Sequence, residues 1–105
     1  MPEEQSSWTF LTNHSLVLMS IYRNPDQRIR DIATTVGITE RAAQQIVRDL
    51  EQGGYLSVTK TGRRNSYRVH ADTPLRHPLQ RGYRVRDLLS AFPIEPAGDR
   101  PRRSR

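Results

Sequence analysis

The chain has 105 residues, of which 34% are hydrophobic and 27% are charged, enough for one small domain and too few for two. Its longest apolar run is four residues, from Leu16 to Met19, whereas a membrane-spanning helix needs ~20. The first residues form neither a basic nor an apolar region, so we expect no secretory signal. The absence of cysteine excludes disulfide scaffolds and thiolate metal sites and leads us to expect a cytoplasmic protein.

Positive charge is concentrated in the second half of the sequence. The chain carries 17 basic and 11 acidic residues, a net charge of +6. Residues 54–70 hold four bases and no acid, and residues 71–105 hold eight bases and four acids. A surplus of this size in a small chain indicates a polyanionic partner, with solubility alone as the alternative explanation.

The first predicted helix is capped by Thr12 or Asn13 and ends near Arg23, because the residue before Pro25 avoids helical backbone angles. Its apolar residues cover more than one stripe, so we expect it to be buried on more than one side. We expect residues 1–7, which precede it, to be disordered.

Two further helices follow, a short one over residues 30–36 and a longer one over residues 39–52. Both show apolar residues at positions i, i+3, i+4 and i+7, first Ile29, Ile32, Ala33 and Val36, then Ala43, Ile46, Val47 and Leu50. Gly37 suits a left-handed residue between them, Thr39 suits the cap of the second helix, and Gly53 stops that helix.

The apolar period then changes to two. Residues 55–60 and 66–70 are predicted to form a β-hairpin around a turn at 61–65. Residues 75–80 are expected to be extended, and residues 83–92 to form a short amphipathic helix. The proline- and arginine-rich residues 93–105 are expected to be a disordered tail.

These elements predict a mainly α-helical fold with a small β-hairpin, an α+β winged helix-turn-helix over residues 8–92. The stretch from Arg28 to Val69 resembles the bacterial winged helix-turn-helix transcriptional regulators of the broad MarR/ArsR type. The flanks WTFLTNH (residues 8–14) and PLRHPL (residues 74–79) are similar to small stand-alone regulators of that kind. The resemblance implies a dimeric DNA-binding fold and leaves the target gene and any effector open.

In such folds the second helix of the pair enters the major groove of DNA. Arginine can pair with guanine and glutamine with adenine, so the outward side chains of residues 39–52 become candidate DNA contacts. These are Thr39, Glu40, Arg41, Gln44, Gln45 and Arg48. An ordinary solvated helix face is the alternative interpretation.

The hairpin supplies the second set of candidate contacts, to the DNA backbone or the minor groove. They are Lys60, Arg63, Arg64, Asn65 and Arg68, with Arg63 and Arg64 expected together at the tip. The alternative is a charged edge that prevents strand-to-strand aggregation.

Apolar side chains at both ends of the domain predict a homodimer, because a domain of this size has little room to bury them. The candidate dimer residues are Trp8, Phe10, Leu11, Val85, Leu88, Leu89 and Phe92. Packing within one chain is the alternative.

Other chemistry finds little support in the sequence. His14, His70 and His77 fall on three different predicted elements, and no spacing marks a nucleophile or a phosphate-binding loop, so we expect no metal, no cofactor and no enzyme. No effector pocket is evident. We therefore expect a sequence-specific regulator that binds double-stranded DNA, with a module docking an acidic protein, or a binder of RNA or single strands, as the rivals.

Overall fold

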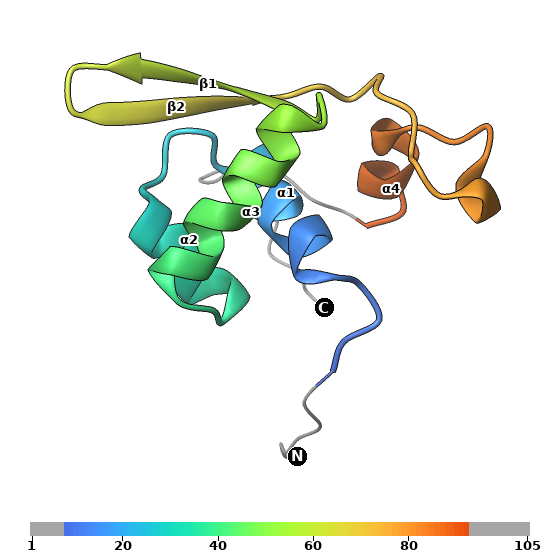
Figure 1. The fold of residues 1–105 in the computed structure, drawn as a ribbon, viewed down its shortest axis with the longest axis horizontal. Helices are drawn as coiled ribbons and strands as arrows, with labels where there is room; N and C mark the ends of the chain where they lie inside the picture. The colour runs from blue at the N-terminus through green and yellow to red at the C-terminus, as the bar shows by residue number, and fades with distance from the viewer. Residues whose placement is uncertain (1–7, 93–105) are drawn as a thin grey trace, which may run out of the picture.

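The computed structural model describes residues 8–92 and shows helices, a β-hairpin and a C-terminal extension (Figure 1). The elements in chain order are α1 (Asn13–Arg23), α2 (Ile29–Val36), α3 (Glu40–Gln52), β1 (Leu56–Thr61), β2 (Arg64–Val69), the 3-10 turn η1 (Pro78–Gln80) and α4 (Val85–Ser90). This is the expected α+β winged helix. The predicted disordered ends, residues 1–7 and 93–105, lie outside the described residues.

Local signals fix the ends of the first three helices as predicted. The hydroxyl of Thr12 accepts a hydrogen bond from the backbone N–H of Ser15 at 3.2 Å, which caps α1. The hydroxyl of Thr39 accepts from the N–H of Ala42 at 3.0 Å and caps α3 in the same way. Between α2 and α3 the backbone of Gly37 has φ of 91°, the left-handed region that favours glycine.

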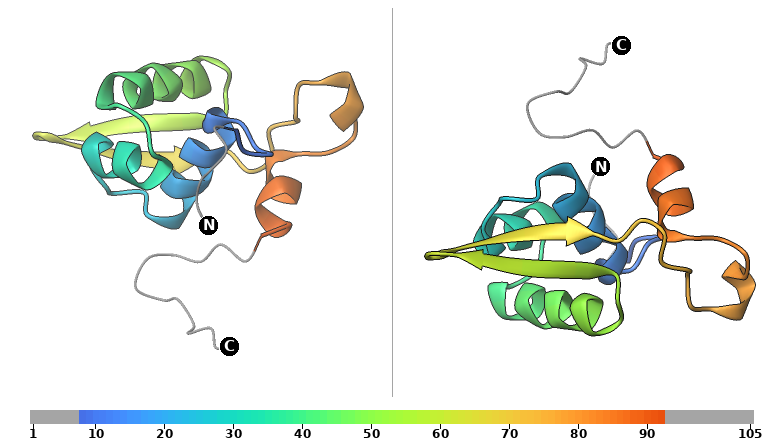
Figure 2. Two further views of the ribbon diagram at one scale, coloured as in Figure 1. Left: turned by 90° about the horizontal axis from the view of Figure 1, so that it is seen from below. Right: turned by 90° about the horizontal axis from the view of Figure 1, so that it is seen from above.

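One hydrophobic core joins the helices, the hairpin and α4. Its members are Val17, Leu18, Ile21, Ile32, Ile46, Val47, Leu50, Tyr55, Leu56, Tyr67, Val85 and Leu89. The hairpin runs across the three helices, and its tip extends past them at one end of the molecule (Figure 2). The α4 helix and the loop before it lie at the opposite end.

The hairpin turn is tighter than the sequence predicted. Thr61 pairs directly with Arg64, so only Gly62 and Arg63 connect the strands. Gly62 has φ of 64° and Arg63 has a negative φ, the pattern of signs found in a type II′ turn. The expected five-residue turn at 61–65 is therefore wrong, because a glycine in the first turn position allows the ladder to continue to its last pair.

The C-terminal extension also differs from expectation. The predicted helix over 83–92 is shorter, since residues before Val85 close a loop: the N–H of Leu75 donates to the carbonyl of Tyr83 at 2.9 Å. The side chain of Asp87 accepts from the N–H of Arg84 at 2.8 Å and starts α4 there. The stretch 75–80, expected to be extended, contains η1, which is capped because the N–H of Leu79 donates to Nδ1 of His77 at 3.1 Å.

Candidate nucleic-acid interface

Helix α3 has one buried and one exposed face, as its apolar period predicted. Ala43, Ile46, Val47 and Leu50 are buried. On the opposite side a polar stripe follows a spacing of four, three and four residues, which places its members above one another along the helix. This stripe consists of the exposed side chains of Arg41, Gln45, Arg48 and Gln52. Gln44 is also exposed but lies on the flank of the stripe, nearer to Glu51.

Two of the candidate residues on α3 are occupied by contacts within the chain. Thr39 is exposed, but its hydroxyl is engaged as the cap of α3. The carboxylate of Glu40 lies 3.9 Å from the guanidinium of Arg30 on α2. Thr39 therefore serves the helix-turn-helix itself, which makes it a weaker candidate for base contacts than the stripe, whereas Glu40 and Arg30 both remain more than half exposed.

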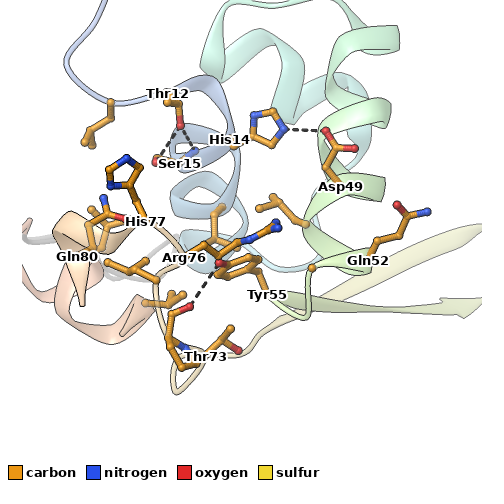
Figure 3. A pocket seen from close by; sticks show the side chains of 18 residues that line it. Thr12, His14, Ser15, Asp49, Gln52, Tyr55, Thr73, Arg76, His77 and Gln80 are labelled. Atoms are coloured by element: carbon orange, nitrogen blue, oxygen red, sulfur yellow. Dashed lines mark hydrogen bonds and ion pairs between the residues drawn. The ribbon is translucent and has the colours of Figure 1, made fainter. Parts of the chain in front are cut away.

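A chain of side chains connects the stripe to the start of α1. The Nη2 atom of Arg48 donates to the amide oxygen of Gln45 at 3.1 Å, and the amide nitrogen of Gln45 donates to Asp49 at 3.0 Å. The other carboxylate oxygen of Asp49 lies 2.8 Å from Nε2 of His14, as Figure 3 shows. These hydrogen bonds, with that of His14 the strongest influence and that of Gln45 the second, hold the pKa of the Asp49 carboxyl below its ordinary value.

The hairpin carries its basic side chains in exposed positions. Arg63 stands at the turn itself, Lys60 pairs across the ladder with Asn65, and Arg68 pairs with Ser57. Side chains alternate between the two faces of a hairpin along each strand, and cross-strand partners share a face. Lys60 and Ser57, the partner of Arg68, are three positions apart in β1, so Lys60 and Arg68 point to opposite faces. Arg63 lies in the turn, and Arg64 begins β2 directly beside it.

Arg64 is held against the loop between α1 and α2. It lies in β2, and its Nη2 atom donates to the backbone carbonyl of Asp26 at 3.3 Å. Next to it, the hydroxyl of Ser66 donates to the Asp26 carboxylate at 3.0 Å, and the N–H of Tyr67 donates to the carbonyl of Pro25 at 2.9 Å. Arg63 and Arg64 stand next to one another at the tip, as the sequence predicted, but Arg64 belongs to the ladder pair that closes the turn and also contacts Asp26.

A comparison with protein-family models matches residues 9–64 to the model of the MarR family. This chain belongs to the MarR family. The match covers more than half of the chain and extends from the segment before α1 to the start of β2. As a member of that family, the chain is a DNA-binding transcriptional regulator with a winged-helix fold, and members of the family typically act as dimers. No curated protein matches it.

The MarR-family match ends at residue 64, and the C-terminal part of the chain adds a groove that the sequence did not reveal (Figure 3). This groove of about 1250 Å³ is open to solvent and lies between the start of α1, the end of α3 and the segment from Thr73 to Leu88. Its apolar lining is Leu11, Leu18, Leu50, Leu75, Val85 and Leu88, and polar groups at its rim include His14, Asp49, Gln52, Arg76 and His77.

Two of the residues assigned to dimerisation belong to the core of a single MarR-family chain. Val85 is 0% exposed and Leu89 is 6% exposed. The amphipathic period of this segment correctly indicated a buried face, but that face packs against the chain's own core. Both residues are therefore withdrawn from the predicted dimer surface.

The other apolar side chains at the two ends are accessible. Trp8 and Phe10 contact one another edge to face, with ring centroids 5.4 Å apart, and are 67% and 93% exposed. Phe92 is exposed, and Leu11 and Leu88 are half-buried at the groove. Two further side chains, Leu79 in η1 and Tyr83 in the loop before α4, are exposed and were not among the predicted dimer residues.

Metal ligation and membrane insertion find no support in residues 8–92 of this MarR-family chain. No three histidine, aspartate or glutamate side chains in that range gather as they would around a metal ion. No helix in the same range is long and apolar enough to cross a bilayer. Each of the three histidines has a different partner: His14 contacts Asp49, His70 contacts Ser57, and His77 caps η1.

Proposed function

We propose that this regulator recognises a specific operator in duplex DNA by placing α3 in the major groove. The observation that carries the proposal is the polar stripe on α3, where Arg41, Gln45 and Arg48 stand exposed opposite the buried face. Arginine and glutamine are the side chains best suited to bidentate contacts with guanine and adenine. Gln52 continues the stripe toward the end of α3, and Gln44 widens the same surface on one flank.

The hairpin serves in this proposal as the wing that contacts the DNA backbone or the minor groove. Arg63 projects at the tip, and Lys60, Asn65 and Arg68 supply further donors along the strands. Contacts of this kind position the protein without reading sequence. Because Arg64 is held by Asp26, we assign it mainly to fixing the wing against the helices.

We further propose a two-fold homodimer formed through the ends of the domain. Its surface comprises Trp8, Phe10, Leu11, Leu88 and Phe92 from the original set, together with Leu79 and Tyr83. The segment before α1 and the segment from η1 to α4 lie away from the tip of the hairpin (Figure 2), so a dimer formed through these segments leaves both wings free. A two-fold dimer requires an inverted-repeat operator with half-site centres ~10 bp, or a multiple of this, apart.

The rival function, docking of an acidic protein, drew on the acidic residues of α3. Two of them contact other side chains of the chain, Glu40 the guanidinium of Arg30 and Asp49 the imidazole of His14. The side chains of α3 that point directly away from the core are then the arginines and glutamines of the stripe, which favours DNA.

In vitro selection from a random duplex library tests the proposed function. We expect the purified protein to enrich an inverted repeat, which then binds at least ~10³-fold more tightly than random duplex. Binding to the selected duplex should weaken steeply as salt increases, since phosphate contacts release counterions. Enrichment of no motif from duplex DNA, alongside tight binding of an acidic polypeptide such as polyglutamate, would favour the rival function.

A further inference from the structure

The connection between α1 and the polar stripe concerns a residue that carries negative charge on the DNA-binding helix. Asp49 lies on the flank of α3 that faces α1 and is only partly buried. A carboxylate at this position repels a polyanion such as DNA. Its contacts with His14 and Gln45, at 2.8 and 3.0 Å, give it a specific structural role.

These contacts determine which way the amide of Gln45 points. A carboxylate can only accept hydrogen bonds and a guanidinium can only donate them. The amide nitrogen of Gln45 must therefore face Asp49, and its oxygen must face Arg48. The reversed amide would set donor against donor at Arg48 and acceptor against acceptor at Asp49, so the chemistry of the two neighbours selects one orientation.

Orientation matters because a glutamine that reads adenine must present its oxygen to the N6 amino group and its nitrogen to N7. The amide of Gln45 retains one N–H and one lone pair beyond its contacts within the chain. These two groups remain available for a base edge in a fixed arrangement. An amide free to rotate would lose part of its discrimination, because its two ends are nearly equal in size and opposite in hydrogen bonding.

We propose that Asp49 and His14 are positioning residues for sequence recognition: Asp49 orients Gln45, and His14 anchors Asp49 to α1. This inference rests on the proposed entry of α3 into the major groove. It assigns the pair to the choice of operator rather than to general affinity for DNA, and it gives the first turn of α1 a part in that choice. The groove also reaches both residues, so the pair is accessible to solvent from that side.

The test compares operator preference among variants of the full chain. The operator and a random duplex are taken from the selection with the wild-type protein, and the ratio of the two affinities is the discrimination. Asp49→Ala is expected to lower the discrimination roughly 3- to 10-fold, a part of the ~5- to 150-fold that a bidentate contact supplies. A repeated selection with Asp49→Ala should show a weaker adenine preference at the position that Gln45 reads.

Two further variants separate positioning from charge. Glu51→Ala removes the same charge from the exposed side of the same helix and should leave the discrimination unchanged. Asp49→Glu restores an acceptor and should recover it. His14→Ala is expected to shift it in the same direction as Asp49→Ala, by a smaller factor. Unfolding temperatures are compared for all variants, because a merely structural role would lower them without changing the selected motif.

A discrimination for Asp49→Ala equal to that of wild type, or an equal fall in Glu51→Ala, overturns the inference. If His14→Ala discriminates as well as wild type, His14 has no positioning role. Gln45→Ala distinguishes these failures from failure of the proposed function. If Gln45→Ala alters the selected motif and Asp49→Ala does not, only the positioning role is wrong. If Gln45→Ala leaves the motif intact, the stripe does not read the bases through this residue.

Discussion

The guanidinium of Arg64 donates to the backbone carbonyl of Asp26, 38 residues away, and so ties the wing to the loop between α1 and α2. Because of this contact, two arginines that are adjacent in sequence have different surroundings. Arg63 is left at the turn with its guanidinium available for a phosphate, whereas part of the donor capacity of Arg64 is engaged within the chain.

We therefore predict different effects for the two arginines. Arg63→Ala should weaken binding to operator and random duplex alike, and should reduce the slope of log K against log salt by about one unit per lost phosphate contact, which is about two units for the proposed dimer. Arg64→Ala should change the slope less. Fluorescence anisotropy titrations at several salt concentrations measure both. The loop between η1 and α4 lies at the end of the molecule opposite the hairpin tip (Figure 2), so Arg81→Ala, the same charge change directly after η1, is the control and should leave the slope near that of wild type.

Substitutions in the polar stripe should affect sequence recognition more than general affinity. Arg48→Ala is expected to cost about 1–3 kcal/mol on the selected operator, with less change on random duplex. Gln44→Ala should cost less than Arg48→Ala, since Gln44 lies on the flank of the stripe. Competition titrations on both duplexes provide the values. Equal losses of binding free energy on operator and random DNA would show that Arg48 contacts the DNA backbone and does not read bases.

The end residues should divide into a dimer surface and a core. Phe10→Asp is expected to yield a folded monomer with weaker operator binding, because each half-site then lacks the linked second contact. Leu89→Ala should instead destabilise the folded chain by about 2–5 kcal/mol, as truncation of a buried leucine does. Light scattering and thermal unfolding measure the two effects. A wild-type monomer at tens of micromolar that still binds its operator tightly would contradict the dimer.

Acid should reveal the contact between His14 and Asp49. The pKa of Asp49 is lower in the folded chain than its ordinary value of 3.8, chiefly because of the hydrogen bond with His14. Ionised Asp49 therefore stabilises the fold above pH 3.8, and this contribution is lost as the pH falls through the lowered pKa. His14→Ala should move the pKa of Asp49 upward, toward its ordinary value. Carboxyl chemical shifts followed by NMR against pH measure it, and an unchanged value would show that the contact has no influence.

Most of the winged helix could be predicted from local sequence signals. Thr12 and Thr39 cap helices through hydrogen bonds three residues away, and Gly37 takes up the left-handed angle that its place between two apolar periods required. Periodicity also identified the buried face of α3. These features depend on neighbours in the sequence, which is why the residues themselves indicate them.

Features that depend on distant partners could not be predicted in this way. His14 and Asp49 are 35 residues apart, and nothing near either residue indicates the other. The period of α4 showed that Val85 is buried without showing against what. Gln52 was also missed as a candidate contact, although its spacing of four from Arg48 is a local signal that could have identified it.

The most direct test of the central claim is the affinity for the selected operator and for random duplex, measured by anisotropy over a range of salt concentrations. The account predicts that log K falls linearly with log salt on both duplexes and that the operator binds at least ~10³-fold more tightly. Equal affinity for the two duplexes would contradict sequence-specific recognition by α3.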